Sequence, residues 1–516
     1  MTTVKRVFQV DGKPFFPIGG QACNSSGYNA AEAEQAFKIT KMINGNTLEI
    51  PVYWEQVEPK EGKFDFTAVD ELLAGARRYE TKLILLWFAS WKNGNMDYAP
   101  KWVKTDTKRF KRVKAESGKD VWDLSSHCKA SMEADKKAFV ALCKHLKAKD
   151  GAERTVIAIQ IENEQGIIGS DRDYGPEAQA EFDSPVPPKL VAAMKKAGCG
   201  RIYDIWQQSG AKKSGSWPEM FGWQAGELMT AWSIASYVDN IAAAAKAAYD
   251  IVLYTNVWLM EQHAWVRAGE SYPSGGGVSK VLDIYKWYTP HLDFIAPDNY
   301  ELDAKGFAEV CANYAREDNP LFVIESNTGL NMFRNIADYN AVGYFTHYEQ
   351  NEDGSLFPEE KRRIDNVRCV AAVIPLLLKY QGTGKIQAII EEEPVKKRGR
   401  AQRLDFDGYM GLAEFNGSER GGGLVFQVSR HEFYFVGVNY KLMLRPKPVI
   451  GQTPVTMLGG VDLTHGNFYN FFVRVCEGHF NAAGEYVVDR RRNGDAARGG
   501  ITVGGPDCVM QLITSD

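Results

Sequence analysis

Residues 156–166 read Val-Ile-Ala-Ile-Gln-Ile-Glu-Asn-Glu-Gln-Gly, an apolar run that ends in a cluster of acids and amides. The β-branched and small apolar residues at its start are typical of a strand buried on both faces. Acids at the carboxyl end of such a strand are typical of a parallel β-barrel, where the packed core ends and the substrate-facing surface begins. An ordinary strand that leads into a polar turn is the alternative that this stretch alone leaves open.

A second stretch has the same form. Residues 321–329 read Leu-Phe-Val-Ile-Glu-Ser-Asn-Thr-Gly, so that one acid, Glu325, follows an apolar run. Two carboxylates on different strand ends of one barrel can flank a sugar and share the work of breaking a glycosidic bond. The pair Glu164 and Glu325 is therefore the first candidate for the catalytic residues.

These residues resemble a known family. Ile161-Glu162-Asn163-Glu164 with a following glycine is similar to the acid/base motif of glycoside hydrolase family 35, the β-galactosidase family of clan A. Residues 54–66, which include Trp54 and Glu58-Pro59 and end in Phe-Asp-Phe, resemble another signature of clan A β-galactosidases. The resemblance covers nearly the whole chain and is to the subgroup that carries a C-terminal β domain of unassigned role.

The resemblance implies a role for each matching residue. Glu164 would be the general acid/base, Glu325 the nucleophile and Tyr300 the tyrosine that contacts the nucleophile, while Asn163 would bind the sugar 2-hydroxyl. Glu162 shares the strand face of Glu164, but the motif assigns proton transfer to the acid after the asparagine. Further substrate-binding candidates lie at other strand ends or in loops: Gln21, Asn24, Glu49, Trp91, Asn256, Trp258 and Trp217. Each of these tryptophans has core packing as its alternative role.

The order of apolar runs and amphipathic stretches predicts the fold class. Eight strand-then-helix units over residues 1–385 predict a (β/α)8 TIM barrel of the α/β class. After the charged stretch 391–403 the pattern changes to short alternating strands such as 423–428 and 432–438. We therefore expect a barrel catalytic domain over 1–385 and a small β-sandwich-like domain over 386–516.

Composition excludes several classes of partner. A net charge of −4 argues against a nucleic-acid partner. The sequence contains no run of 18 apolar residues, so no membrane-spanning helix is predicted. The eight cysteines and eight histidines are scattered without the spacing of a metal site, so we expect no metal and no other cofactor. No apolar signal region begins the chain, so a cytoplasmic protein is expected, or a periplasmic or secreted one if a signal peptide preceded it. The composition leaves the oligomeric state open, and a homo-oligomer is one alternative.

Two departures from the resemblance concern the sugar. Many relatives have Glu and His where this chain has Gln21 and Cys23, and the broader family has Trp-Asn-x-His-Glu-Pro where residues 54–59 read Trp-Glu-Gln-Val-Glu-Pro. The favoured function is a retaining, exo-acting β-galactosidase on an oligosaccharide or small glycoside. The alternatives are the same mechanism on a β-glucoside or arabinopyranoside, a transglycosylase, and a catalytically retired carbohydrate-binding barrel.

Overall fold

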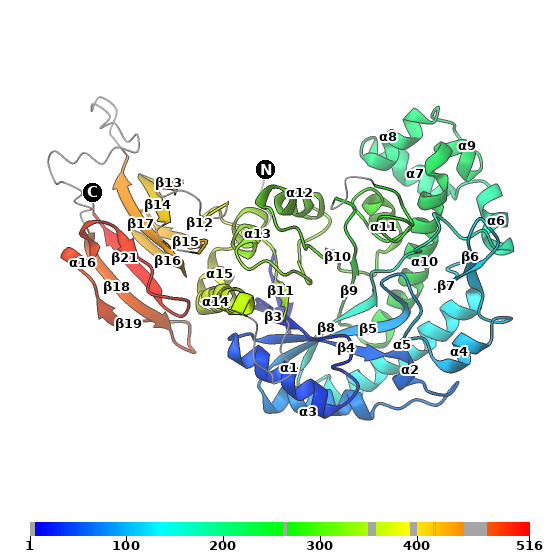
Figure 1. Cartoon of the computed structure of the whole chain (residues 1–516), viewed down its shortest axis with the longest axis horizontal. Helices are drawn as coiled ribbons and strands as arrows, with labels where there is room; N and C mark the ends of the chain where they lie inside the picture. Colours follow the sequence, from blue (N-terminus) through cyan, green and yellow to red (C-terminus); the bar gives the residue numbers. More distant parts are fainter. Residues whose placement is uncertain are drawn as a thin grey trace.

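A computed structural model describes residues 6–261, 266–348, 358–392, 400–415, 417, 419–447 and 472–515. A parallel seven-stranded sheet forms the centre of its larger part, shown on the right of Figure 1. In sheet order the strands are β10 (Phe294–Pro297), β9 (Val252–Val257), β8 (Val156–Asn163), β5 (Lys82–Lys92), β4 (Thr47–Tyr53), β3 (Ile18–Gln21) and β11 (Tyr344–His347).

The segment between β10 and β11 closes this sheet into a barrel without being a regular strand. Parallel bridges join Asp298 to Glu325 on one side and Val323 to Tyr344 on the other. The predicted (β/α)8 barrel is therefore confirmed as the fold class, but its seventh position is a bridged segment. Every residue of β4 and β8 is buried, as expected for strands that pack on both faces.

Helices follow the strands and cover the outside of the barrel. The β1–β2 hairpin (Phe8–Val10 and Lys13–Phe15) precedes the first barrel strand, and the β6–β7 pair (Arg112–Lys114 and Asp120–Leu124) lies in the loop after β5. The helices of the ring are α1 (Ala30–Met42), α2 (Trp54–Val57), α3 (Thr67–Arg78), α4 (Lys101–Thr105), α5 (Lys129–Asp150), α10 (Ala225–Ala248), α11 (Leu282–Tyr288), α12 (Ala304–Tyr314), α13 (Asn331–Tyr339), α14 (Pro358–Ala372) and α15 (Ile374–Tyr380).

An excursion of short helices separates β8 from its covering helix α10. These helices lie at the end of the barrel that is farthest from the C-terminal sheets, at the upper right of Figure 1. They are α6 (Pro176–Asp183), α7 (Pro188–Ala197), α8 (Arg201–Gln208), α9 (Trp217–Phe221) and the 3-10 turn η1 (Gly222–Gln224). Within the described residues no helix is long and apolar enough to cross a membrane.

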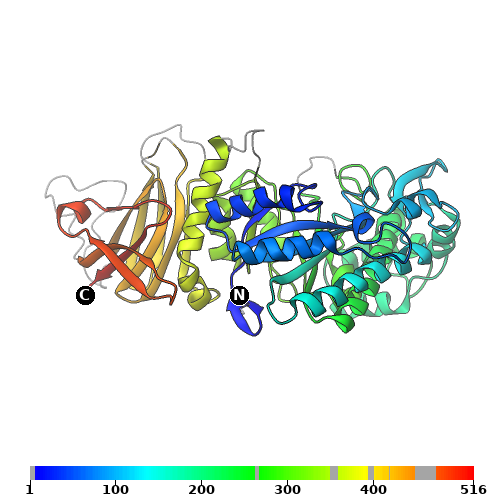
Figure 2. The same cartoon turned by 90° about the horizontal axis from the view of Figure 1, so that it is seen from below.

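Two antiparallel sheets form the C-terminal part, on the left of Figures 1 and 2. The six-stranded sheet is β12 (Ile386–Ile390), β15 (Gly422–Ser429), β16 (Glu432–Val438), β21 (Val509–Thr514), β18 (Phe472–Phe480) and β19 (Tyr486–Arg491). The four-stranded sheet is β13 (Arg400–Phe406), β14 (Tyr409–Phe415), β17 (Tyr440–Pro446) and β20 (Ile501–Thr502), and α16 (Asp495–Arg498) precedes β20.

The six-stranded sheet is apolar on both faces. On β15, Leu424 and Phe426 belong to the core that continues into the barrel, whereas Val425 between them belongs to the core between the two sheets. This alternation follows from the two-residue period of a strand. Helices α13, α14 and α15 lie between the barrel strands and this sheet (Figure 2), so the C-terminal part packs directly on the barrel.

Candidate active site

The carboxylate of Glu325 lies at the carboxyl edge of the barrel and accepts hydrogen bonds from four side chains. Its Oε1 accepts from Gln21 Nε2 at 3.0 Å and from the Nδ2 atoms of Asn163 and Asn256, each at 3.3 Å. Its Oε2 accepts from the Tyr300 hydroxyl at 2.8 Å. Four strand ends therefore supply donors to this acid, which is only 7% exposed.

The end of β8 departs from regular strand geometry. Glu162 and Glu164 have φ values of +60° and +46°, in the left-handed region that non-glycine residues rarely adopt. On a regular strand Glu162 and Glu164 would share a face and Asn163 would point to the other. Because both flanking residues are left-handed, the alternation breaks, and both Asn163 and Glu164 approach Glu325.

Neighbouring strands hold this strained turn in place. The Glu164 N–H donates to Asn256 Oδ1 at 2.9 Å, and the Asn93 and Gly94 N–H groups after β5 donate to the carbonyls of Asn163 and Glu164. The backbone of the turn is thus fixed from both sides. Such overdetermination is what a strained backbone needs in order to persist.

Three carboxylates meet at the site. One oxygen from each of Glu164, Asp298 and Glu325 lies within 4.8 Å of the others, and all three residues are buried. Burial, together with the nearby charge of Glu325, raises the pKa of Glu164 to about 7. Burial and the charges of Glu325 and Glu164 raise the pKa of Asp298 well above its usual range. Since Glu164 and Asp298 are in hydrogen-bond contact, this pair retains a proton near neutral pH.

The three acids could also serve as ligands of a cation, since carboxylate oxygens at this spacing are hard ligands. Four hydrogen-bond donors already surround Glu325, however. The expectation of no metal stays a prediction.

Asn256 connects the three acids. Its Nδ2 donates to Asp298 Oδ2 at 2.8 Å and also reaches Glu325, while its Oδ1 accepts from the Glu164 backbone. Removal of this one amide would therefore disturb all three carboxylates.

Glu49 lies within the barrel strand β4, in register with Gln21 at the end of β3, and is close enough to Glu325 for their charges to interact. Its Oε1 accepts from the Tyr254 hydroxyl at 3.3 Å, whereas its buried Oε2 has no partner in the described part of the chain. Burial and the charge of Glu325 raise the pKa of Glu49 well above its usual range. Glu49 can therefore carry a proton and offer a hydrogen bond to a sugar hydroxyl.

The structure brings most of the predicted site residues together. Gln21, Asn163, Asn256 and Tyr300 contact Glu325 directly, and Glu49 lies close enough for their charges to interact. Asn24 lies beyond the end of β3 with an exposed side chain, and Trp258 follows β9 as a half-buried residue. No contact joins either of them to the acids among the described residues.

Two of the predicted sugar-binding tryptophans have fully buried rings, which argues against a role as sugar platforms. Trp217 packs at the start of α9 against Phe221 and Trp232, in the helical excursion. Trp91 packs edge-on against Tyr237 of α10. A fully buried indole stabilises the core and offers no face to a ligand.

Glu162 faces away from the acid cluster. Its Oε2 accepts a hydrogen bond from the Trp91 backbone N–H at 2.8 Å. Burial of Glu162 and the nearby charge of Asp135 raise the pKa of Glu162 well above the usual range. Its contacts are with the backbone of β5 and with the side chain of Asp135 on α5.

Asp298 was missed in the sequence, although it stands in a suitable position. It follows β10 directly and comes two residues before Tyr300. A carboxylate at the end of a barrel strand was the signal that selected Glu164 and Glu325. The same signal, applied to the sixth strand, would have selected Asp298.

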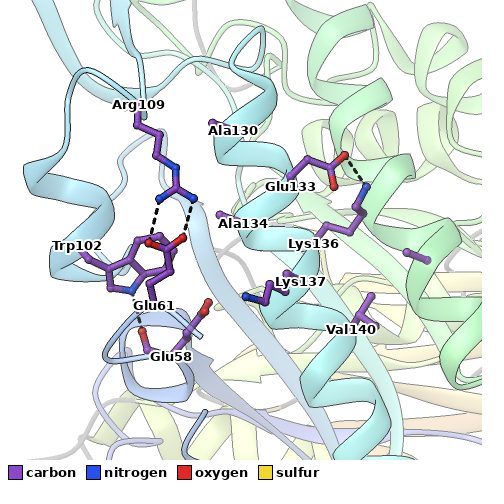
Figure 3. A pocket seen from close by; sticks show the side chains of 11 residues that line it. Glu58, Glu61, Trp102, Arg109, Ala130, Glu133, Ala134, Lys136, Lys137 and Val140 are labelled. Atoms are coloured by element: carbon purple, nitrogen blue, oxygen red, sulfur yellow. Dashed lines mark hydrogen bonds and ion pairs between the residues drawn. The ribbon is translucent and has the colours of Figure 1, made fainter. Parts of the chain in front are cut away.

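A different pocket of about 570 Å³ lies on the flank of the barrel, between α5 and the residues after α2 (Figure 3). Its charged groups neutralise one another, because Arg109 forms two hydrogen bonds with Glu61 and Lys136 pairs with Glu133. Trp102 donates its Nε1 hydrogen to the carbonyl of Glu58. None of the three clustered acids lines this pocket.

Comparison with protein families gives two matches. The family model described as "Beta-galactosidase", that of glycoside hydrolase family 42, matches residues 26–207. A domain of unknown function, DUF5597, matches residues 366–504. The first match includes Glu164 and ends before Glu325. No curated protein matches the chain in sequence.

Several solved structures are similar to the chain at low identity. A β-galactosidase from the psychrophilic Marinomonas ef1 is 12% identical over 69% of this chain and 60% of its own, with a TM-score of 0.49. A catalytic mutant of a family 42 β-galactosidase from G. stearothermophilus is 14% identical over 70% of this chain and 57% of its own, with a TM-score of 0.48. The β-amylase catalytic domain from Paenibacillus polymyxa is 15% identical over 67% of this chain and 96% of its own, also at 0.48. The chain thus spans about three fifths of the length of those galactosidases.

The barrel, the acid cluster at its carboxyl edge and the matching enzyme family define the class of protein. The chain has a TIM barrel of the type found in glycosidases, with acids clustered at its carboxyl edge. The family that its sequence matches is family 42, over residues 26–207. The predicted membership of family 35 is not supported, and the match indicates family 42 instead.

Proposed function

We propose that the chain is a retaining, exo-acting β-glycosidase that removes terminal β-galactosyl groups, with Glu325 as nucleophile and Glu164 as acid/base. The observation that carries the proposal is the close approach of the two carboxylates, which bring oxygens within 4.8 Å of each other. Retaining enzymes hold their carboxyl groups about 5–5.5 Å apart, whereas inverting enzymes need about 6.5–9.5 Å to admit a water molecule.

In the first step Glu325 attacks the anomeric carbon while Glu164 gives its proton to the leaving oxygen. A Glu164 pKa of about 7 supports this role, because a large fraction of the acid, about half, still carries its proton at neutral pH. The four donors around Glu325 suit a carboxylate that attacks in its ionised form. The bond from Asn163 would pass to the sugar 2-hydroxyl and strengthen toward the transition state.

In the second step Glu164 removes a proton from water, which attacks the ester between the sugar and Glu325. Formation of that ester removes the negative charge of Glu325, one of the causes that raise the pKa of Glu164. The pKa of Glu164 then falls, which favours the ionised form that a general base requires. Asp298 shares the retained proton with Glu164 and so keeps the pair at one proton in the resting enzyme.

The matched family model supports galactose as the sugar. Gln21 at the end of β3 and Glu49, which pairs with it on β4, would bind the hydroxyls of this terminal sugar. A β-glucoside or arabinopyranoside would be hydrolysed by the same mechanism with other contacts at these positions.

The mechanism and the sugar can be tested together. A panel of 4-nitrophenyl β-glycosides should show the highest kcat/KM for the β-galactoside. Proton NMR of the first product should show the β anomer before mutarotation. A first product in the α form would exclude retention, and a higher kcat/KM for another β-glycoside would exclude galactose as the preferred sugar.

We also propose that the catalytic domain spans residues 1–385 and the β domain 386–516. The start of β12 at Ile386, directly after the last helix of the ring, supports this division. Because the six-stranded sheet shares an apolar core with the barrel, the β domain should not separate as a free unit. Limited proteolysis that releases an active, freely soluble fragment of 1–385 would contradict the proposal.

A further inference from the structure

A polar groove of about 590 Å³ lies between the barrel and the C-terminal sheets, within the size range of ligand sites. On the barrel side it is lined by the loop after Glu325 and by the start of α14. On the other side it is lined by the residues around Arg420 and by the end of β16. Figure 1 shows α13 and α14 beside these sheets.

Two stretches of the groove wall follow closely in sequence on residues of the acid cluster. The wall includes Asn327, two residues after Glu325, and Leu302, two residues after Tyr300. Both stretches leave the carboxyl edge of the barrel, the edge where substrates of such barrels bind. Sugars beyond the scissile bond would leave the acids along these two stretches and reach the groove.

The lining is suited to hydroxyl groups. It contains four asparagines, at 327, 331, 366 and 439, and the charged side chains of Arg362, Arg420, Asp365 and Glu419. Amides, guanidinium groups and carboxylates donate and accept the paired hydrogen bonds that sugar hydroxyls require. Leu302, which is 67% exposed, adds an apolar surface at the rim.

Several of these polar groups lack a partner among the described residues. Asn331 and Asn366 are 2% and 4% exposed, and the Oδ1 atom of each makes no hydrogen bond. The Nη2 atom of Arg420 is also buried without a partner, although its Nε donates to the Glu391 carbonyl. Buried polar atoms are usually hydrogen-bonded, so unpaired ones that line a groove indicate a ligand.

The residues on both sides of the groove are closely packed. Gly329 packs so closely on α14 that an added Cβ would lie 2.5 Å from Asn366 Nδ2. On the other side, an added Cβ at Gly422 would lie 2.6 Å from the Leu330 side chain. The β domain is therefore held against the loop that follows Glu325, and the groove is already formed without a ligand.

We propose that this groove binds the leaving-group sugars of a β-linked oligosaccharide, so that the C-terminal β domain completes the substrate site. The inference rests on the proposed glycosidase function and extends it to the substrate class. The terminal sugar lies at the acids, and the sugars beyond the scissile bond extend between Asn327 on the barrel and Asn439 on the β domain. The preferred substrate is then an oligosaccharide and not a small glycoside.

The test compares two substrates that share a terminal β-galactosyl group: its 4-nitrophenyl glycoside and a neutral tetrasaccharide. The variants are Arg362→Ala, on the barrel wall, and Asn439→Gly, on the β domain. Both residues are exposed, and glycine retains the left-handed backbone of Asn439, so folding should be preserved. The matched control is Arg403→Ala, an exposed arginine of β13 outside the groove.

Each groove variant should lower kcat/KM for the tetrasaccharide about 10-fold, the effect of one lost hydrogen bond of about 1.4 kcal/mol, and leave the aryl glycoside unchanged. The control should change neither. An unchanged kcat/KM for the tetrasaccharide in the groove variants, or equal losses on both substrates in the variants, would overturn the groove proposal.

A binding measurement separates this proposal from the proposed function. If the wild-type protein hydrolyses no β-glycoside, the proposed function fails, and calorimetry with the tetrasaccharide still tests the groove. An affinity that falls about 10-fold in Arg362→Ala and Asn439→Gly, but not in Arg403→Ala, would support it. Absence of binding, or equal affinity in all variants, would overturn it.

Discussion

Glu164 at the barrel mouth and Glu477 in the β domain are almost equally buried, at 7% and 9% exposure, yet their surroundings differ. Glu477 lies on β18 and forms two hydrogen bonds with Arg490, at 2.7 and 2.9 Å, and another with Arg492. These bonds hold the pKa of Glu477 below its usual range. Burial and the charge of Glu325 instead raise the pKa of Glu164 to about 7.

The difference shows that burial alone does not mark a catalytic acid. A buried acid with matched cations stabilises the fold, whereas a buried acid beside other acids is kept reactive at a cost in stability. The barrel mouth and the β18–β19 pair thus use the same side chain for opposite purposes.

The largest effect is expected for Glu325→Ala. Loss of the nucleophile should lower kcat on the order of 10⁵-fold, while the folded structure persists. Steady-state rates on an activated aryl glycoside would measure it, with circular dichroism as the folding check. A loss of less than about 10-fold would remove Glu325 from the reaction.

Glu164→Gln should have a smaller effect that depends on the leaving group. Glycosides with poor leaving groups need protonation and should lose about 10²–10⁴-fold in rate, whereas activated aryl glycosides should lose less in the first step. In the wild-type protein the rate should fall as pH rises through about 7, because Glu164 loses its proton there. This basic limb should be absent in Glu164→Gln with the activated substrate, and an unchanged limb would contradict its assignment to Glu164.

Stability should respond in opposite directions to the loss of the two acids. A carboxyl group whose pKa is raised by folding destabilises the folded protein at every pH above the pKa of that group in the unfolded chain. Glu164→Gln should therefore raise the free energy of unfolding at pH 8 by on the order of 3 kcal/mol. At pH 4 that gain should vanish, because the acid is then protonated in both states. Thermal unfolding at the two pH values would measure the gain, and a Tm at pH 8 that is lower than in the wild-type protein would contradict the account.

Glu477→Gln should destabilise the protein by about 1–3 kcal/mol at neutral pH, because charged hydrogen bonds to two arginines are lost. The pKa of Glu477 is lowered in the folded state, so its contribution is present above the unfolded pKa and is lost as pH falls through the folded one. The Tm difference between variant and wild type should therefore shrink in acid, and kcat on aryl glycosides should not change. A lower kcat with an unchanged Tm would reverse the assigned role.

The smallest functional effect is expected for Trp217→Phe. Since the indole is fully buried beside Phe221 and Trp232, the change should cost stability and leave KM unaltered. A rise in KM without a change in Tm would restore Trp217 as a sugar platform.

The sequence was sufficient for the barrel and the paired acids because both follow from short local patterns. A buried strand shows as an apolar run, and its end shows as the first polar residues after it, as at Glu164 and Glu325. The irregular seventh strand could not be foreseen, because its apolar composition is the same whether it forms a full ladder or two bridges.

The orientation of side chains was the second feature that could not be predicted from the sequence. The left-handed residues Glu162 and Glu164 break the alternation on which a strand-face argument depends, so their different roles needed coordinates. The sequence around the tryptophans has no regular alternation of apolar and polar residues, so it does not predict which rings are buried. In the structure Trp91 and Trp217 lie in the core. Asp298 is a different case, since its position after β10 was visible in the sequence.

The most direct test of the central claim is chemical rescue by azide with an activated aryl β-galactoside. In Glu164→Ala, azide should attack the ester on Glu325 and yield the β-galactosyl azide. In Glu325→Ala, azide should replace the nucleophile and yield the α-galactosyl azide. NMR of the products distinguishes the anomers. Swapped anomers would exchange the roles of the two acids, and no rescue in either variant would contradict a double displacement at this site.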